Sequence, residues 1–364
     1  MCKIIKQNGK NLGKPYIYSL KLSISILKKY SFKNDYSEGA HPAILNRLIE
    51  TNSIQTVGYG EDIFCEEARA SIKEKLQQEA DIHFVSGGTQ ANLIVISSIL
   101  RPHESVIAVE SGHIAVHETG AIEATGHKVN TVPTTNGKIT IEGIQTILDL
   151  HTDEHMVKPK MVYISNSTEV GSVYNKAELS AIYDFCQANN LYLFVDGARL
   201  GSALTSSKCD LTLADMAQLT DVFYIGGTKN GALIGEAIII KNPKLNDDFR
   251  YHIKQKGGML AKGRLIGIQF AEMFKNDLFF EMGKHANAMA KKLAEGIAAK
   301  GFDFLTEPSS NQIFPIFSNQ QIEKLQENFE FFVWQKMDEN KSAVRLVTSW
   351  ATHEDQVENF LNQL

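Results

Sequence analysis

The sequence predicts an α/β protein with a large domain, built on a mostly parallel seven-stranded sheet, and a smaller C-terminal α/β domain. Apolar strand segments alternate with helical segments between about residues 81 and 240, and such alternation is typical of parallel sheets covered by helices. A chain of 364 residues, 43% of them hydrophobic, is also long for a single domain. We expect an N-terminal appendage over 1–30, the large domain over 31–245 and the small domain over 246–364.

The appendage differs in charge from the rest of the chain. Residues 1–30 contain seven Lys and no acidic residue, which leaves 30 Lys and Arg against 42 Asp and Glu, a net charge of −12, for residues 31–364. An acidic body argues against nucleic acid as a partner. Lys21 interrupts the one apolar stretch of the appendage, which lacks Arg and a small-residue cleavage site, so neither a signal nor a transit peptide is expected. No apolar run reaches the roughly 18 residues of a membrane span.

The four cysteines are scattered through the chain. Cys2, Cys65, Cys186 and Cys209 form no CxxC pair and show no regular spacing. Neither a metal site nor a disulfide framework is therefore expected, and the thiols are typical of a reduced, cytoplasmic protein.

The first half of the large domain begins with helices and then enters the sheet. Pro42 suits the start of a helix, the glycines around Tyr59 indicate a loop over 53–64, and 66–80 is an amphipathic helix. Strands are expected at 81–85 and 106–109 and after Gly126, with helices after the Gly87–Gly88 turn and from near His117.

The strand, Gly-Gly turn and helix at 81–99 would leave the backbone N–H groups of Gly88, Thr89 and Gln90 free at a helix N-terminus. Such a terminus binds phosphate through its free donors and its dipole. The alternative is that the glycines only form a tight turn with Thr89 as the helix cap.

The second half of the large domain repeats the alternation. A strand at 161–165 leads into a polar loop at 166–171 and a helix from near Lys176, and two apolar strands then end at Asp196 and before Lys229. One more strand follows at 232–240. In the C-terminal domain we expect long helices, strands at 311–317 and 343–350 with a helix between them, and a last helix.

Asp196 and Lys229 lie at the C-terminal tips of two buried strands, the edge where sites of parallel sheets collect. A carboxylate and an amine so placed suit pyridoxal phosphate (PLP), whose ring nitrogen needs a carboxylate partner and whose aldehyde forms a Schiff base with lysine. His113 follows another strand end, where it could stack on a ring or transfer a proton. The other histidines are expected to be structural.

Several motifs together resemble the threonine aldolase family, within the fold-type I PLP enzymes and their β-eliminating lyase relatives. They are SGGTQANL at 86–93, SGHIAVHETGAIEATGH at 111–127, FVDGARLGSAL at 194–204 and IGGTKNG at 225–231. The resemblance covers about residues 31–364. It implies a fold-type I PLP-dependent transferase-like architecture, and a homodimer or homotetramer whose active sites are shared between subunits.

The resemblance assigns the catalytic and cofactor-binding residues one by one. It implies that Lys229 binds the cofactor aldehyde, that Asp196 pairs with the ring nitrogen and that His113 stacks on the ring. The phosphate would be held by Gly88, Thr89 and Gln90, with Lys262 reaching it from a neighbouring subunit.

The remaining assignments concern the substrate. Arg199 and Arg345 resemble the arginines near the cofactor hydroxyl and the substrate carboxylate, and guanidinium groups suit carboxylates because they bind both oxygens. Arg345 could instead be an outward residue of an alternating strand. Asn34 falls in the substrate-side loop.

The sequence departs from the family pattern in two loops. Many relatives carry a histidine where this chain has Asn166 to Glu169, and a serine where it has Asn34. The catalytic base is therefore open between His113 and Glu169 acting through water.

The expected reaction is PLP-dependent retro-aldol cleavage of L-threonine or L-allo-threonine to glycine and an aldehyde. The first alternative is a PLP-dependent β-eliminating amino-acid lyase, which would use the same cofactor residues. A nucleotide-binding module is disfavoured because GGTKNG and SGGTQ match neither GxxxxGK[ST] nor GxGxxG. A catalytically silent scaffold would leave the presence of both Asp196 and Lys229 unexplained.

Overall fold

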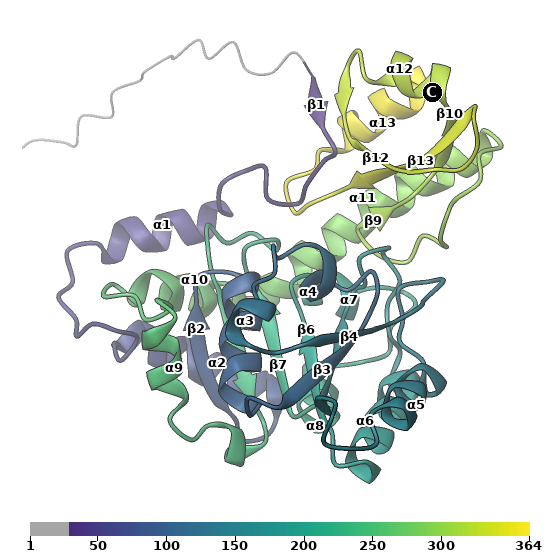
Figure 1. The fold of residues 1–364 in the computed structure, drawn as a ribbon. Helices are drawn as coiled ribbons and strands as arrows, with labels where there is room; N and C mark the ends of the chain where they lie inside the picture. The colour runs from purple at the N-terminus through teal and green to yellow at the C-terminus, as the bar shows by residue number, and fades with distance from the viewer. Residues whose placement is uncertain (1–28) are drawn as a thin grey trace, which may run out of the picture.

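The computed structural model describes residues 29–364, so most of the lysine-rich appendage lies outside the described residues. Its centre is a seven-stranded sheet of order β2-β8-β7-β6-β5-β3-β4 (Figure 1). Six of these strands run in the same direction, and only β8, between β2 and β7, runs opposite to them. This confirms the mostly parallel sheet. The strands are β2 (Asp81–Val85), β3 (Glu104–Val109), β4 (Val129–Val132), β5 (Lys158–Ser165), β6 (Tyr192–Asp196), β7 (Val222–Gly226) and β8 (Glu236–Ile240).

Helices cover both faces of this sheet. Alternate strand side chains enter two separate apolar clusters: Leu193 and Val195 belong to one, and Phe194 between them belongs to the other. One cluster includes side chains of α1 (Pro42–Thr51), α2 (Ile63–Leu76), α5 (Ile141–Leu150), α6 (Lys176–Ala188), α7 (Leu200–Leu204), α8 (Leu213–Gln218) and α10 (Arg264–Phe274). The other includes side chains of α3 (Gly88–Ile99), α4 (His113–Val116) and α9 (Phe249–Gln255).

The helix starts show how local sequence positions these elements. Asn175 and Glu178 form a reciprocal capping box at the start of α6, and Asp62 accepts hydrogen bonds from two backbone N–H groups of α2. Such caps satisfy donors that a helix leaves unpaired. The start of α3 is different, because its N-cap is Gly87 and no side chain caps it.

The expected helix from near His117 is wrong. The chain forms only the single turn α4 (His113–Val116), and a short 3₁₀ helix follows at Glu123–Thr125. Between them, Thr119 and Gly120 have φ angles of 53° and 72°, a left-handed conformation that ends a right-handed helix. His113 is the first residue of α4, after Gly112 as its N-cap.

The C-terminal lobe has its own apolar core. The strands expected near 311–317 and 343–350 and the two expected helices are present, and two further strands, β11 and β12, were not anticipated; β11 pairs with β1 (Tyr30–Ser31) and β12 with β13. The lobe sheet has the order β10-β13-β12, and β9 also pairs with β13. Its elements are β9 (Gln312–Ile313), β10 (Ile316–Ser318), α12 (Asn319–Leu325), β11 (Phe329–Glu330), β12 (Phe332–Lys336), β13 (Lys341–Val347) and α13 (Glu354–Gln363).

The first described residues belong to this lobe. The strand β1 (Tyr30–Ser31) pairs with β11, and Phe32 lies in the lobe core. The chain then passes Asn34 and Asp35 on its way to α1, while α11 (Leu278–Ala299) runs from the large sheet back to the lobe (Figure 1). The helices α9 and α10 follow residue 246 but pack into the apolar clusters of the large sheet. The predicted boundary between the large domain, 31–245, and the small domain, 246–364, therefore stays a prediction.

Within residues 29–364, no helix is long and apolar enough to cross a membrane. Cys65, Cys186 and Cys209 carry free thiols, and Cys2 lies outside the described residues. Burial raises the pKa of both the Cys65 and the Cys186 thiol to about 12, so these two side chains are unreactive at neutral pH.

Candidate active site

Six of the predicted site residues line one cavity of about 430 Å³. They come from separate parts of the chain, which meet because β5, β6 and β7 are parallel and end at the same sheet edge and because the C-terminal lobe closes over that edge. The six residues are Asn34, His113, Glu169, Arg199, Lys229 and Arg345.

Lys229 follows β7 and lines this cavity. Burial lowers its pKa, the positive charge of Arg199 lowers it further, and the nearby carboxylates of Asp35 and Asp196 oppose this only in part. A lowered pKa increases the fraction of neutral amine, the form that attacks an aldehyde.

Asp196 ends β6 and is almost fully buried. Its Oδ2 accepts hydrogen bonds from the Tyr163 hydroxyl at 2.6 Å and from Asn92 Nδ2 at 3.2 Å. Its Oδ1 accepts from the Ala198 backbone N–H at 2.9 Å and from the Tyr224 hydroxyl. Burial alone would raise the pKa of Asp196, but His113 and the tyrosine hydroxyls outweigh it and the pKa is lowered.

His113 is held by two acidic residues. Its Nδ1 lies 2.8 Å from Oε1 of Glu118, whose side chain is fully buried, and its backbone N–H donates to Glu169 Oε1 at 3.0 Å. Burial would lower the pKa of His113, but the hydrogen bond to Glu118 and the charge of Asp196 raise it. Asn92 Nδ2 also donates to Glu118 at 2.7 Å. Because the same amide donates to Asp196, it links the His113–Glu118 pair to Asp196.

Glu169 has one occupied and one free oxygen. Its Oε1 accepts from the Ser165 hydroxyl at 2.7 Å as well as from the His113 backbone, and its Oε2 is buried without a hydrogen-bond partner. Burial raises the pKa of Glu169. This carboxyl group can therefore hold a proton at a higher pH than an ordinary glutamate.

Arg199 is fixed before any substrate binds. Its Nε and Nη2 donate to the two oxygens of Asp35 at 2.6 and 3.0 Å, and Asn311 Nδ2 donates to the same carboxylate at 3.0 Å. The Asp35 side chain is fully buried. This bidentate pair leaves other N–H donors of Arg199 available to the cavity.

Arg345 lies on β13 and lines the cavity, so it is not an outward strand residue. Its guanidinium carbon is 5.2 Å from the Phe332 ring centroid and 5.3 Å from that of Trp334, and both rings come from the unanticipated strand β12. Its Nη2 donates to the Lys33 carbonyl at 3.2 Å, while its Nε is buried without a partner. The two rings and the Lys33 carbonyl thus hold the arginine in place, and one of its N–H donors has no partner among the described residues.

The start of α3 keeps the predicted phosphate donors. No side chain caps Gly88, Thr89 or Gln90, and a Cβ on Gly88 would lie 2.9 Å from the Tyr224 hydroxyl, which places this turn close to Asp196. The Gln90 side chain is engaged with Ser86 and with the Lys256 carbonyl. Gln90 would therefore serve a phosphate through its backbone N–H, alongside those of Gly88 and Thr89.

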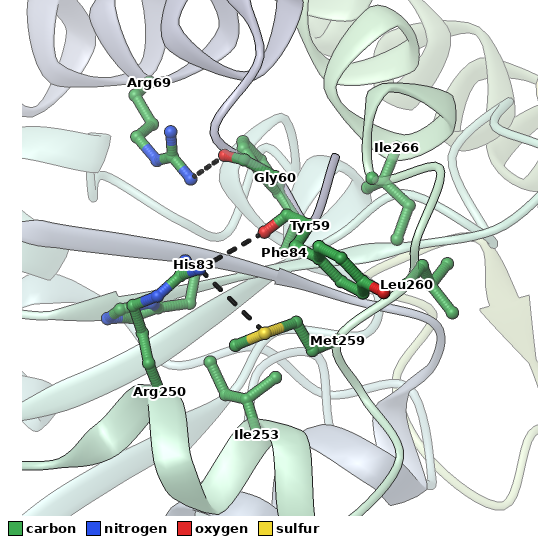
Figure 2. A pocket seen from close by; sticks show the side chains of 11 residues that line it. Tyr59, Gly60, Arg69, His83, Phe84, Arg250, Ile253, Met259, Leu260 and Ile266 are labelled. Carbon is green, nitrogen blue, oxygen red and sulfur yellow. Dashed lines mark hydrogen bonds between the residues drawn. The ribbon is translucent and has the colours of Figure 1, made fainter. Parts of the chain in front are cut away.

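Lys262 is exposed and lines a different pocket from Lys229. Its segment packs against the loop around Tyr59, because the Tyr59 N–H donates to the Ala261 carbonyl at 3.2 Å. Figure 2 shows two arginines that fix this loop: Arg69 donates to the Gly60 carbonyl at 2.7 Å and Arg250 to the Tyr59 carbonyl at 3.4 Å. The small cavity between them measures about 20 Å³, enough for about one water molecule.

These features fit PLP. A buried carboxylate, an amine of lowered pKa, an uncapped helix start and an arginine with an unpaired buried donor occur in or beside this cavity. The amine and the arginine line it, and Asp196 lies close enough to His113 and Lys229 to act on their charges. The helix start lies against the Tyr224 hydroxyl that binds Asp196. The four features match the ring nitrogen, the aldehyde, the phosphate and a substrate carboxylate, respectively. The large sheet and this site define a fold-type I PLP-dependent enzyme.

Comparisons with known proteins agree. Residues 37–320 match the model of the beta-eliminating lyase family. A low specificity L-threonine aldolase from Pseudomonas aeruginosa is 30% identical over 90% of this chain and 94% of its own length. A solved structure of Leishmania major threonine aldolase is 50% identical and covers 92% of this chain and 98% of its own, with a TM-score of 0.91.

The fold is shared more widely. A Thermus thermophilus aspartate aminotransferase structure is 16% identical, with a TM-score of 0.68 over 92% of this chain and 90% of its own. The chain belongs to the beta-eliminating lyase family and, within it, to the group of threonine aldolases.

Besides Tyr36, His117 and Gln312, which line the cavity, five polar residues around it were missed from the sequence: Asn92, Glu118, Tyr163, Tyr224 and Glu236. Four of these five bind Asp196 or His113 directly. Tyr163 and Tyr224 sit inside strands, where aromatic residues are ordinary. Glu236 was visible as an acid in the apolar run GEAIII, whereas Glu118, between His117 and Thr119, carried no such signal.

Glu236 is a buried acid at the start of β8. Its Oε2 accepts from the Gly227 backbone N–H at 3.0 Å, and burial raises its pKa to about 8. The folded protein therefore holds a proton that the unfolded chain releases near pH 4.5. The stability from this group is fully present below pH 4.5 and is lost as the pH rises toward 8.

We predict that Glu236→Gln removes this pH dependence. Relative to wild type, the variant apoprotein should gain free energy of unfolding between about pH 5 and about pH 8. Urea unfolding at the two pH values measures it, with Glu74→Gln, on the exposed face of α2, as the control. A constant difference between Glu236→Gln and wild type would contradict the prediction.

Proposed function

We propose that the chain is a threonine aldolase that cleaves L-threonine or L-allo-threonine into glycine and acetaldehyde. The observation that carries the proposal is the single cavity in which Lys229 lies beside a base held by a buried acid and an arginine with a free donor. The kinship with threonine aldolases supports the same reaction. When bound, PLP supplies an aldehyde that links to the substrate amine and a protonated ring that accepts the electron pair released at Cα.

In this proposal, Asp196 binds the ring nitrogen and keeps its proton in place, because the carboxylate stays ionised. The start of α3 binds the phosphate through the backbone N–H groups of Gly88, Thr89 and Gln90. The Lys229 amine holds the cofactor between turnovers and gives way to the substrate amine.

The arginines orient the substrate. Arg345 binds the substrate carboxylate through its guanidinium group, which lines the cavity, and Arg199, fixed by Asp35, binds beside it near the cofactor hydroxyl and the same carboxylate. Asn34 completes this end of the site. Holding the carboxylate selects which bond at Cα stands perpendicular to the cofactor ring, and aldol cleavage requires that this be Cα–Cβ.

His113 takes the proton from the β-hydroxyl group, so that the C–O bond becomes a carbonyl as Cα–Cβ breaks. Glu118 binds Nδ1 of His113 and leaves Nε2 as the proton acceptor. Glu169, the second candidate base, has a raised pKa and a free oxygen, which suits it better to donating a proton than to accepting one.

The proposed function is tested by product analysis. Holoenzyme incubated with L-threonine and with L-allo-threonine should release glycine and acetaldehyde in equal amounts, and Lys229→Ala should lose both this activity and the absorption band of the lysine-bound cofactor. A 2-keto acid with ammonia, from threonine or from an amino acid with a β-leaving group, would instead establish a β-eliminating lyase.

The base is identified by the pH profile of kcat/KM. His113→Asn should lower kcat by about 10²- to 10⁴-fold. Activity should fall as the pH drops through the pKa of His113, because protonated imidazole cannot accept a proton. Glu118→Gln keeps the hydrogen bond but loses the charge that raises the His113 pKa, so this acid limb should move to lower pH.

Glu169→Gln is the matched variant for that experiment and should retain the acid limb where wild type has it. If the limb stays fixed in Glu118→Gln and disappears in Glu169→Gln, Glu169 is the base and the assignment of His113 is wrong.

We further infer a cytoplasmic homodimer or homotetramer with shared active sites. Val57 is 65% and Tyr59 is 47% exposed, although both belong to a loop held rigidly against the Lys262 segment. Exposed apolar side chains on an ordered loop are typical of subunit interfaces. In the proposed assembly Lys262 reaches the phosphate of the neighbouring subunit. The free thiols are consistent with a reducing compartment.

Subunit mixing tests the shared site. Lys229→Ala and Lys262→Ala should each be nearly inactive alone, because each removes one component of every site. Mixed dimers would contain one intact site, so unfolding and refolding the two variants together should restore roughly a quarter of wild-type activity. No recovery, in a mixture shown to contain mixed dimers, would contradict the shared site.

A further inference from the structure

Two buried tyrosines flank Asp196 from the neighbouring strands. Tyr163 lies on β5 and Tyr224 on β7, on either side of β6. The Tyr163 hydroxyl donates to Oδ2 at 2.6 Å and the Tyr224 hydroxyl donates to Oδ1, so each carboxylate oxygen has its own phenol. Both tyrosines are 1% exposed, which leaves no solvent to replace these bonds.

The placement of the two hydroxyls is rigid. The three side chains project from the same sheet face, because Tyr163 is in register with Phe194, two residues before Asp196. The Phe194 ring packs between the tyrosines, with centroid distances of 5.6 Å to Tyr163 and 6.3 Å to Tyr224. Neither phenol can rotate away without opening the core.

Tyrosines at these positions need a reason beyond packing. A phenylalanine would fill the same space among the apolar side chains of this cluster without the cost of burying a hydroxyl group. Burial and the negative charge of Asp196 raise the pKa of both phenols well above the usual value, so they remain donors at every physiological pH. The carboxylate therefore receives two permanent hydrogen bonds.

We propose that Tyr163 and Tyr224 are positioning residues that hold Asp196 ionised and in fixed orientation as the receptor for the cofactor ring nitrogen. A carboxylate taken out of water tends to bind a proton unless donors replace its hydration. The two phenols, with the Ala198 N–H and Asn92, replace it on both oxygens. The inference rests on the proposed assignment of Asp196 to the ring nitrogen.

The experiment is a double-mutant cycle read out as the PLP dissociation constant, not as turnover. Tyr163→Phe and Tyr224→Phe should each weaken PLP binding by about 10- to 100-fold, the usual range for a hydrogen bond to a charged group. In the Asp196→Asn background the same substitutions should have little further effect, because the charge on which they act is absent.

The pH dependence of PLP binding separates this role from packing. Without one phenol the pKa of Asp196 rises, so the ratio of variant to wild-type dissociation constants should increase as the pH falls from about 8 to about 6. Tyr174→Phe is the matched control, because Tyr174 is equally buried and its hydroxyl accepts from the Ile139 N–H at 2.7 Å, away from Asp196. For Tyr174→Phe, the ratio of variant to wild-type dissociation constants should stay near one at every pH in this range.

Each outcome has a distinct meaning. If Asp196→Asn binds PLP as wild type does, the assignment of Asp196 is wrong. If Asp196→Asn weakens binding but the tyrosine variants behave like Tyr174→Phe, or weaken binding equally in the Asp196→Asn background, the tyrosines are only structural and the inference fails. Should one tyrosine variant not fold, the other still completes the cycle.

Discussion

The buried carboxylate of Asp196 is the interaction on which the rest of the site depends. A charge inside a protein must be compensated, and here the compensation comes from four separate segments: Tyr163 on β5, Tyr224 on β7, Asn92 on α3 and the Ala198 backbone. Those donors can converge only if the strands are parallel and end together. The chemistry of the site therefore requires this sheet order.

A second polar network connects the cofactor end to the proposed base. Asn92 bridges Asp196 and Glu118, and Glu118 binds His113, so the group that would hold the ring nitrogen and the group that would take the substrate proton share one amide. Asn92 Oδ1 and Glu118 Oε2 have no hydrogen-bond partner within residues 29–364, but moving Asn92 would take a donor from both Asp196 and Glu118. Losing buried hydrogen bonds to charged groups costs enough free energy to hold the network in place. Rigidity suits a reaction in which the orientation of one bond selects the products.

Sequence reasoning worked best where local pattern and chemistry coincide. The strand ends at Asp196 and Lys229 and the uncapped turn at Gly88 were visible because apolar runs end abruptly in residues of distinct chemistry. It failed at α4, where the positive φ angles of Thr119 and Gly120 break an otherwise helical pattern. It also missed β12, whose Phe332 and Trp334 look like any exposed strand until they are seen around Arg345.

By itself, the sequence determined the α/β class, the cofactor and the family, because strand periodicity and strand-end residues are local properties of the chain. The resemblance named six of the side chains that line the cavity, but only the tertiary structure decided how they reach it and which buried partners hold them. Asn34 and Asp35 reach it because β1 pairs within the C-terminal lobe, and Arg345 reaches it because that lobe covers the sheet edge. Tyr163 and Tyr224 gain their roles from the same long-range packing, since each binds Asp196 from a separate strand, whereas Glu118 binds His113 only five residues away and needs the fold chiefly to bury that pair.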